Sequence, residues 1–249
     1  MKERIITSIV LLIILLVVGL VDNVYLTGLL ISIISILAMF EAKNLFRVED
    51  SVFYFLSLLS ILSIFINPLF IGVVGVLGVS GYVAFYQKEI NLISIAIYPF
   101  LPLMVLFELY LKTSMNMIFY LILVVALTDS FAYLIGKNFK GQFFKKPFSP
   151  TSPNKSWEGV IGGVLIGSVT GAFVGMMFFN FLESLFISFV LSLSSVFGDL
   201  FESFLKRRAG VKDSGNILPG HGGILDRIDG YLFSAPLLFS IVIAIGYGC

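Results

Sequence analysis

The chain has 249 residues, of which 58% are hydrophobic and 12% are charged, and its formal net charge is +1. An ordinary soluble domain carries about 25% charged residues, so this composition excludes a soluble globular protein and predicts an integral membrane protein. The single cysteine, Cys249, excludes an internal disulfide and a cysteine-rich metal site.

Nine apolar segments are predicted to cross the bilayer. A crossing helix needs about 20 mostly apolar residues, and roughly 17 can suffice. Helices are favoured because lipid offers no partner for an unpaired backbone group. The predicted spans are residues 5–21, 24–40, 51–66, 69–86, 92–111, 116–136, 158–180, 182–200 and 230–247. The expected fold class is all-α, a polytopic membrane helix bundle of nine transmembrane helices.

The two ends of the chain and the third span leave alternatives. The first span follows Lys2 and Arg4 as a signal peptide would, but no small-x-small cleavage site follows it and a second span begins at once. The third span is short and precedes Asn67-Pro68, so spans three and four are alternatively a re-entrant pair, which leaves the sidedness of later spans unchanged. The chain ends directly after an apolar run, and a short further tail is an open alternative.

Basic residues fall almost entirely on one side of the predicted membrane. When the spans alternate in direction, Lys112 is the only one of the 16 Lys and Arg residues on the side opposite the N-terminus. Because basic residues concentrate on the cytoplasmic side, we expect a cytoplasmic N-terminus. Ten of them lie in two loops, 137–157 and 201–229. The net charge therefore hides a basic cytoplasmic face, which suits anionic lipid or nucleotide phosphates.

Two spans carry regularly spaced glycines. One repeats every four residues and the other every three; they are Gly159, Gly163, Gly167, Gly171 and Gly175, and Gly72, Gly75, Gly78 and Gly81. Such ridges of small residues let a second helix approach closely, either from the same chain or from a second copy. Pro99 and Pro102 predict a kink in the fifth span.

Acidic residues lie in or near the apolar spans. Asp129 is inside the sixth span, and a lone intramembrane carboxylate usually faces a polar cavity or a partner; a structural hydrogen bond is the alternative. Asp199 ends the eighth span and is followed by Glu202, Ser203 and Lys206. These four share one face if the helix continues, although Glu202 and Lys206 are also spaced as an ordinary i,i+4 ion pair.

Asp226 and Asp229 lie three residues apart at the mouth of the last span. If that segment is helical, both carboxylates point the same way, and two unpaired like charges at a membrane boundary repel. A divalent cation would remove this conflict. Oxygen ligands without a cysteine cluster favour Mg²⁺, which leaves positions for water and substrate phosphate. A solvated loop in which Arg227 pairs with either acid is the alternative.

The residues before these two acids are rich in glycine. Gly220, Gly222 and Gly223 surround His221, the only histidine, and such a loop can bring backbone N–H groups close to phosphate oxygens. The flanking basic residues are Lys206, Arg207, Arg208, Lys212 and Arg227. The sequence therefore predicts a membrane-embedded site for Mg²⁺ and a polyphosphate, open to the cytoplasm.

These segments resemble the phosphatidate cytidylyltransferase family, whose members are also called CDP-diacylglycerol synthases. The stretch SFLKRRAGVKDSGNILPGHGGILDRID, residues 203–229, fills every fixed position of the signature S-x-x-K-R-x4-K-D-x-G/S/A-x2-hydrophobic-P-x-H-G-G-x-x-D-R-x-D. The segments TDSFAYLIGKNF (128–139), SPNKSWEG (152–159) and GDLFES (198–203) resemble further family motifs. The first 90 residues match only as apolar spans, whereas a pattern with this many fixed polar positions is highly specific.

The resemblance implies that CTP and phosphatidic acid give CDP-diacylglycerol and pyrophosphate with Mg²⁺. A phosphatidate oxygen would attack the α-phosphorus of CTP in line, without a covalent enzyme intermediate, so that catalysis is mostly positioning and charge neutralisation. The expected partners are CTP, phosphatidic acid and the lipid bilayer, not nucleic acid, and a homodimer is an open alternative to a monomer. The expected location is the bacterial inner membrane, with the active site facing the cytoplasm.

The resemblance also implies roles for individual residues. The expected metal ligands are Asp199, Asp226 and Asp229, with Asp129 as a candidate for a second metal ion. The expected catalytic residues are Asp199, Asp226, Asp229, Lys206, Arg227 and His221; the histidine would donate to pyrophosphate or orient an aspartate. The expected substrate-binding residues are Asn154, Lys155, Ser156, Ser203, Arg207, Lys212, Gly220, Gly222 and Gly223. Of these, Asn154, Lys155 and Ser156 are expected at the lipid phosphate.

The expected organisation is an N-terminal transmembrane region, residues 1–90, and a catalytic transmembrane region, residues 91–249, with the cytoplasmic loops 137–157 and 201–229. Two other functions fit parts of the sequence. A CTP-dependent polyprenol or lipid kinase would transfer the γ-phosphoryl group and release CDP. A cation-coupled transporter would use Asp129 as an ion site, but it would not need the basic, glycine-rich loop.

Overall fold

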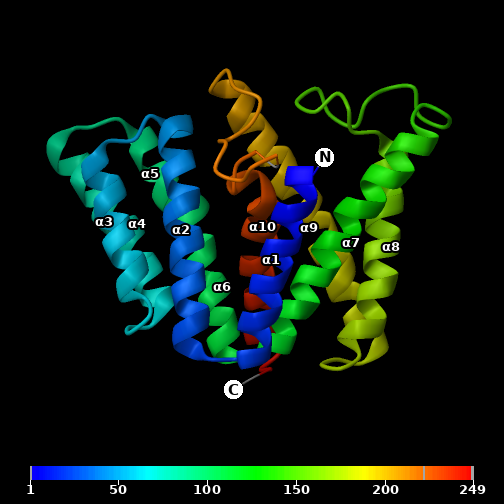
Figure 1. Cartoon of the computed structure of the whole chain (residues 1–249), viewed down its shortest axis with the longest axis horizontal. Helices are drawn as coiled ribbons and strands as arrows, with labels where there is room; N and C mark the ends of the chain where they lie inside the picture. Colours follow the sequence, from blue (N-terminus) through cyan, green and yellow to red (C-terminus); the bar gives the residue numbers. More distant parts are fainter. Residues whose placement is uncertain (1, 221, 248–249) are drawn as a thin grey trace. The chain divides into compact units, whose positions relative to one another are not determined.

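The computed structural model describes residues 2–220 and 222–247, and for residues 2–5 the backbone alone. His221, with its expected role at pyrophosphate or an aspartate, and Cys249 lie outside the described residues. Within the described residues, helices are joined by loops that contain two isolated β-bridges, and no β-strand is present (Figure 1). The predicted all-α helix bundle is confirmed.

The helices belong to two compact units. The first consists of Met1–Met115 and Ala209–Ile228, and the second of Asn116–Arg208 and Asp229–Cys249. This division reflects which helices contact one another, and it does not depend on which residues take part in catalysis. It does not bear on the functional division at residue 90, which stays a prediction.

In addition to the start of α10 (Leu225–Ala244), the described residues of the first unit form four helices and a broken segment. They are α1 (Lys2–Val21), α2 (Val24–Phe46), α3 (Asp50–Leu62), α4 (Pro68–Tyr86) and the segment Ile90–Lys112. Asparagines start two of them, because the side-chain oxygens of Asn23 and Asn67 accept N–H groups of the first turns of α2 and α4. Pro68 follows at the first helical position of α4, where its missing N–H has no cost.

Polar contacts join alternate loops of the first unit. At one end, Glu49 before α3 accepts hydrogen bonds from Lys88 Nζ at 2.8 Å and Tyr82 Oη at 2.9 Å. At the other end, Tyr110 Oη donates to Asp22 at 2.8 Å. Consecutive helices therefore run in opposite directions within this unit (Figure 1), as the alternating spans require.

The segment Ile90–Lys112 is interrupted in its middle. It consists of a 3₁₀ turn (Ile90–Leu92), α5 (Ile93–Ile95), a π turn (Ala96–Phe100) and α6 (Leu101–Lys112). Tyr98 leaves the helical region with φ −146° and ψ 113° directly before Pro99, and proline biases the preceding residue toward extended conformations. Pro102 lies in the first turn of α6, where proline is tolerated. The predicted kink is confirmed.

The described residues of the second unit form four long helices: α7 (Met115–Phe139), α8 (Trp157–Gly175), α9 (Phe181–Arg208) and α10 (Leu225–Ala244). α10 begins in the first unit and continues in the second. α9 extends beyond the predicted end at residue 200, so Asp199 to Lys206 lie on one continuous helix. α10 begins before residue 230, so Asp226 and Asp229 are both helical, as their interpretation required.

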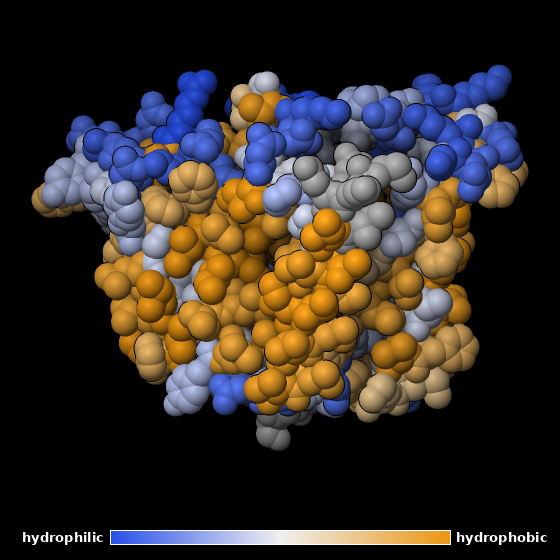
Figure 2. Space-filling view, viewed as in Figure 1, coloured by the Kyte–Doolittle hydropathy of each residue, from blue (hydrophilic) through white to orange (hydrophobic). Residues whose placement is uncertain are grey.

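Among the residues that the structure describes, seven segments are long and apolar enough to span a membrane: α2, α4, Ile90–Lys112, α7, α8, α9 and α10. Ile6–Val21 and Asp50–Leu62 are shorter apolar helices. On the face shown in Figure 2, apolar side chains cover the middle of the helices and hydrophilic ones gather at their ends, as a bilayer requires. The protein is an integral membrane protein; the number of nine spans and the cytoplasmic N-terminus stay predictions.

The glycine ridge of α8 packs against helices of the same unit. A Cβ added at Gly163 would lie 2.6 Å from the carbonyl oxygen of Thr128 on α7, and one at Gly171 would lie 2.7 Å from Ser188 Oγ on α9. Such distances are too short for real atoms, so only glycine permits these contacts. The predicted close packing is confirmed, and the partner helices come from the same chain rather than from a second copy.

The glycines of α4 divide into two groups. A Cβ at Gly72 would lie 2.8 Å from the Leu101 side chain, and one at Gly78 would lie 2.9 Å from Phe55. In the described part of the chain, no atom beyond the glycine's own stretch of α4 lies within 4 Å of the corresponding position at Gly81. The ridge therefore packs against α6 and α3 but does not extend to Gly81.

Candidate active site

A cavity of about 470 Å³ lies in the second unit, bordered by α7, α8, α9 and the loop between α7 and α8. Its polar lining consists of Asp129, Lys137, Lys140, Asn154, Lys155, Ser156 and Asp199. This volume is within the range of small-molecule sites, about 300–1,000 Å³. The cavity brings together three motifs that are separate in the sequence, and Asp129 is one of the residues that line it.

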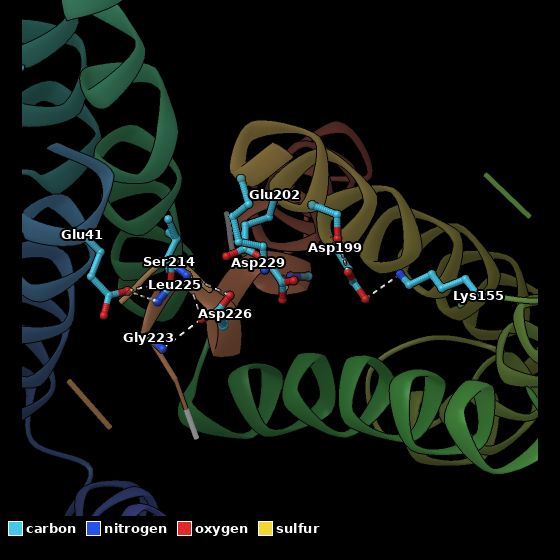
Figure 3. Close-up of polar contacts among 12 residues, drawn as sticks. Glu41, Lys155, Asp199, Glu202, Ser214, Gly223, Leu225, Asp226 and Asp229 are labelled. Atoms are coloured by element: carbon cyan, nitrogen blue, oxygen red, sulfur yellow. Dashed lines mark hydrogen bonds and ion pairs between the residues drawn. The ribbon is translucent and has the colours of Figure 1, made fainter. Parts of the chain in front are cut away.

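Lys155 and Asp199 form an ion pair at this cavity (Figure 3). Lys155 Nζ lies 2.5 Å from Asp199 Oδ2, and Ser203 Oγ, one turn further along α9, donates to Asp199 Oδ1 at 3.4 Å. The lysine and aspartate side chains are 24% and 33% exposed. A lysine ammonium has three donors, so Lys155 can bind a phosphate oxygen that enters the cavity while it remains close to Asp199.

Further charged side chains are buried on α9 and α10. Glu202 and Lys206 form an ion pair at 2.6 Å, with the glutamate side chain 1% exposed, so the i,i+4 pairing weighed from the sequence is present. Asp229 is buried as well. The negative charges of Asp199, Glu202 and Asp129 act on Asp229. Like charges gathered in a membrane bundle are costly, and this concentration is typical of a functional site.

The first turn of α8 holds the loop that lines the cavity. Ser156 is the N-cap of α8, and its Oγ accepts the Gly159 N–H at 3.1 Å. The buried Glu158 accepts the N–H groups of Phe143 and Phe144 at 3.0 and 2.9 Å. Ser156 therefore lines the cavity as predicted for a binding residue, but its side chain already has a structural hydrogen bond.

The same loop exposes aromatic and basic side chains. Phe143 is 76% exposed, and the rings of Phe144 and Phe148 lie 6.1 and 4.8 Å from the ring of Trp157. Four exposed lysines belong to this region: Lys137, Lys140, Lys145 and Lys146. Aromatic and basic side chains together are typical of the interface between a bilayer and water.

The signature segment in the first unit, residues 209–228, folds into a tight loop that leads into α10. Leu218 and Gly222 form an isolated antiparallel bridge, with the Leu218 N–H donating to the Gly222 carbonyl at 3.0 Å. Gly220 and Gly222 have φ values of +74° and +84°, a region that favours glycine. At these two positions the signature segment has glycine because the backbone adopts a positive φ angle, and this reason is independent of any bound phosphate.

Asp226 joins the two sides of this loop. Its Oδ2 accepts the N–H of Gly223 at 2.9 Å and the N–H of Ser214 at 3.1 Å (Figure 3). The Gly223 N–H, which the sequence analysis offered to a phosphate, is thus committed to a carboxylate in this structure. The expected role of Asp226 at a metal ion stays a prediction, and to it the structure adds a role in shaping the loop.

A second carboxylate, Glu41 of α2, contacts the same loop from within the first unit. Its Oε2 accepts hydrogen bonds from Ser214 Oγ and the Leu225 N–H, both at 2.9 Å. Its Oε1 accepts the Ile224 N–H at 3.0 Å. Figure 3 shows the Glu41 side chain directed at this loop.

The predicted site residues occur in both units. In the second unit lie Asp129, Asn154, Lys155, Ser156, Asp199, Ser203, Lys206, Arg207 and Asp229, and in the first lie Lys212, Gly220, Gly222, Gly223, Asp226 and Arg227. The cavity unites the first five of these. Arg207, Lys212 and Arg227 are exposed, as expected of side chains that meet a soluble nucleotide. Their assigned roles stay predictions.

Four residues of these surroundings were not predicted. Lys137 and Lys140 line the cavity, and Glu158 and Glu41 hold the two loops. Glu158 lies in the motif at 152–159 and is its only acid, which is a signal that could have been used. Glu41 directly follows a predicted span, and an acid at the edge of an apolar span is a sequence signal of the same kind as Asp129.

The carboxylates in the described part of the chain do not form a group of metal ligands. Within residues 2–220 and 222–247, no three His, Cys, Asp or Glu side chains are placed to hold one metal ion. The acids of the second unit nevertheless act on one another electrostatically, and they offer oxygen donors only. This donor chemistry suits a hard cation such as Mg²⁺.

The chain belongs to the cytidylyltransferase family, whose model matches residues 2–245, and it is therefore a nucleotidyltransferase. It is 39% identical over 241 residues to a phosphatidate cytidylyltransferase of Helicobacter pylori strain J99, covering 94% of this chain and 89% of that protein. A protein of the same name from Aquifex aeolicus is 35% identical over 247 residues, covering 89% and 91%. One from Bacillus subtilis is 44% identical over 132 residues, covering 52% and 48%. The predicted family is confirmed.

Proposed function

We propose that the protein is a phosphatidate cytidylyltransferase, which converts CTP and phosphatidic acid to CDP-diacylglycerol and pyrophosphate in phospholipid biosynthesis. The observation that carries this proposal is the match to proteins of that name along nearly the whole chain. The cavity of the second unit supports it, because a lysine and polar groups at one end of membrane helices suit an anionic lipid headgroup.

In this proposal the chain's own residues position two phosphates. Lys155 and Asn154 hold the phosphate of phosphatidic acid in the cavity, and the exposed Arg207 and Arg227 meet the phosphates of CTP. A phosphatidate oxygen attacks the α-phosphorus of CTP, and the bond from that phosphorus to the pyrophosphate oxygen breaks. The lipid phosphate is itself the nucleophile, so the enzyme needs to orient the reactants and neutralise their charge.

We also propose Mg²⁺ as the cofactor. Asp199 and Asp229 would hold it, since their like charges act on each other in the second unit and a divalent cation offsets that repulsion. Asp129 is the candidate for a second ion, and Asp226 is a further ligand expected from the sequence. When bound, Mg²⁺ supplies neutralisation of charge on the phosphates.

The loop between α7 and α8 supports entry of the lipid from the membrane. Phe143 and Phe144 are exposed beside Lys145 and Lys146, and this loop ends at Lys155 in the cavity. Aromatic side chains enter the interfacial region of a bilayer, and lysines attract anionic headgroups at its surface. We therefore expect a lipid substrate to reach Lys155 from the membrane.

We further propose that the enzyme resides in the bacterial inner membrane with its cavity on the cytoplasmic side, where CTP is found. Its relatives in Helicobacter, Aquifex and Bacillus are bacterial proteins, and the distribution of basic residues supports this orientation. A homodimer stays a sequence-based alternative, to which the glycine ridges lend no support because they pack within the chain.

The orientation predicts the accessibility of introduced cysteines in a Cys249→Ser background. Lys145→Cys and Val211→Cys should react with a membrane-impermeant thiol reagent only from the cytoplasmic side, because both lie in the basic loops. Lys112→Cys is the matched control and should react only from the other side. Labelling of position 145 or 211 from outside would contradict the orientation.

A substitution of Lys155 tests the lipid-phosphate site. Lys155→Met keeps much of the aliphatic stem but removes the charge, so the KM for phosphatidic acid should rise by about tenfold or more, whereas the KM for CTP should change far less. Lys88→Met, which removes a lysine from the ion pair with Glu49, is the control and should alter neither constant. A rise confined to the KM for CTP would instead assign Lys155 to the nucleotide.

Pyrophosphate release tests the proposed activity. Purified protein in mixed micelles with Mg²⁺ should release pyrophosphate only when CTP and phosphatidic acid are both present, and CDP-diacylglycerol should form in equal amount. Diacylglycerol in place of phosphatidic acid should give no pyrophosphate, since it lacks the attacking phosphate. Release that does not depend on phosphatidic acid would contradict the proposal.

A further inference from the structure

The contacts of Glu41 have a consequence for the start of α10. The first N–H groups of a helix have no acceptor within the helix, and Glu41 accepts the first of α10, from Leu225, together with that of Ile224, the residue before the helix. A carboxylate is favoured there because the N-terminus of a helix carries partial positive charge. The N-terminus of α10 could otherwise bind a substrate phosphate, but the buried side chain of Glu41 already occupies it.

Two glycines of the loop are explained by the same carboxylate. A Cβ added at Gly215 would lie 2.7 Å from Glu41 Cδ, and one at Gly223 would lie 2.8 Å from it. Larger residues at these positions would push the loop away from Glu41. The family signature requires a small residue at the first position and glycine at the second, and in this chain both permit the approach of one side chain.

Glu41 and Asp226 act on the same loop through shared partners. Ser214 donates its hydroxyl to Glu41 and its N–H to Asp226. Gly223 donates its N–H to Asp226 and packs against Glu41. Both carboxylates accept hydrogen bonds from the same loop. A shift of Glu41 would therefore move Ser214 and Gly223, whose N–H groups orient Asp226.

We infer that Glu41 is a positioning residue of the enzyme: it fixes the loop 214–225 and the first turn of α10, and through them the side chains of Asp226 and Arg227, without touching substrate. The kinetic part of this inference rests on the proposed function, whereas the anchoring part does not. Glu41 is 1% exposed, which agrees with a role away from solvent and substrate.

The substitution Glu41→Gln tests the inference with almost no change of shape. The amide has one oxygen and one NH₂ group, so either Ile224 or Leu225 would face a donor instead of an acceptor. We expect amide hydrogen exchange in residues 214–225 to accelerate by about tenfold or more relative to the rest of the chain. The KM for CTP should rise by about tenfold while the KM for phosphatidic acid stays within about twofold.

Glu108→Gln is the matched control. Glu108 is also a buried glutamate of the first unit, 2% exposed, and it accepts hydrogen bonds from Asn67 Nδ2 at 2.8 and 2.7 Å. Its substitution should lower overall stability without a selective change in the exchange of residues 214–225 or in the KM for CTP. Ser214→Ala, which removes one of three hydrogen bonds to Glu41, should give a smaller effect in the same direction and serves if Glu41→Gln fails to fold.

The outcomes separate this inference from the proposed function. Unchanged exchange of residues 214–225 in Glu41→Gln would overturn the anchoring role. Faster amide exchange of residues 214–225 with an unchanged KM for CTP would overturn the positioning role of Glu41, although Glu41 would still anchor the loop. A wild-type protein without pyrophosphate release would overturn the proposed function, and the exchange measurement would still decide whether Glu41 anchors the loop.

Discussion

Replacing Asp229 by asparagine is expected to lower turnover by about 100- to 1,000-fold, since a proposed carboxylate ligand of the Mg²⁺ ion that neutralises the phosphates would be lost. The fold should persist. Asp229 is buried among the negative charges of Asp199, Glu202 and Asp129, so Asp229→Asn relieves repulsion, and its amide oxygen can still accept the backbone N–H that Asp229 Oδ1 binds. The measurement is kcat as a function of Mg²⁺ concentration, together with thermal stability in detergent.

Asp226→Asn should differ from Asp229→Asn in a defined way. Asp226 shapes the signature loop through Ser214 and Gly223, so its substitution should lower turnover and also loosen residues 214–225. Glu183→Gln, at the start of α9 and away from the cavity, is the control and should leave kcat unchanged. Near-normal activity of both asparagine variants at limiting Mg²⁺ would show that neither aspartate serves the metal ion.

Gly167→Leu is expected to cause the largest loss of stability among substitutions outside the site. A Cβ at Gly167 would lie 2.9 Å from Ser192 Oγ and would also collide with Thr128, and these two residues are hydrogen-bonded to each other across α7 and α9. Forcing a leucine between them should destabilise the second unit by about 3 kcal/mol. The measurement is the midpoint of thermal unfolding in detergent.

Gly81→Leu provides the control for this prediction. Among the described residues, no neighbouring element comes within 4 Å of a Cβ at Gly81, so the same leucine should be accommodated on the surface of α4 with little change in the midpoint. Equal unfolding midpoints for Gly167→Leu and wild-type protein would contradict the close packing of α8 against α7 and α9.

Much of the fold was predictable from local signals. Apolar length located the helices, and Pro99 located the break in the fifth span, because a proline disturbs its own helix whatever surrounds it. The glycines of α8 predicted a close contact. They could not say which helices approach, since Thr128 and Ser188 carry no mark of that role in the sequence.

The sequence predicted those site residues that are polar within an apolar or motif-rich stretch. It did not predict those whose role depends on partners far away along the chain. Asp129, Asp199 and Lys155 are unusual residues in their local sequence, and the structure brings them to one cavity. Glu41 was missed because its donors lie more than 170 residues away along the chain. The sequence marks Glu41 as an acid beside an apolar span, but it does not show that this acid will cap the start of a helix so distant along the chain.

Asp226 and Gly223 illustrate a further limit. Charge and spacing predict a metal ligand and a phosphate donor at these positions, but the structure joins them by a hydrogen bond of 2.9 Å. A motif specifies which residues are present, and the folded loop decides which of them bind each other. The same holds for Ser156, whose hydroxyl caps α8.

The central claim, transfer of a cytidylyl group to a lipid phosphate, is tested most directly by following the phosphates of CTP. Purified protein should be incubated with phosphatidic acid, Mg²⁺ and CTP labelled either at the α-phosphate or at the γ-phosphate. We predict that the α-label appears in the lipid fraction as CDP-diacylglycerol and that the γ-label appears only in pyrophosphate. A γ-label in the lipid, with release of CDP, would contradict cytidylyl transfer and identify a lipid kinase.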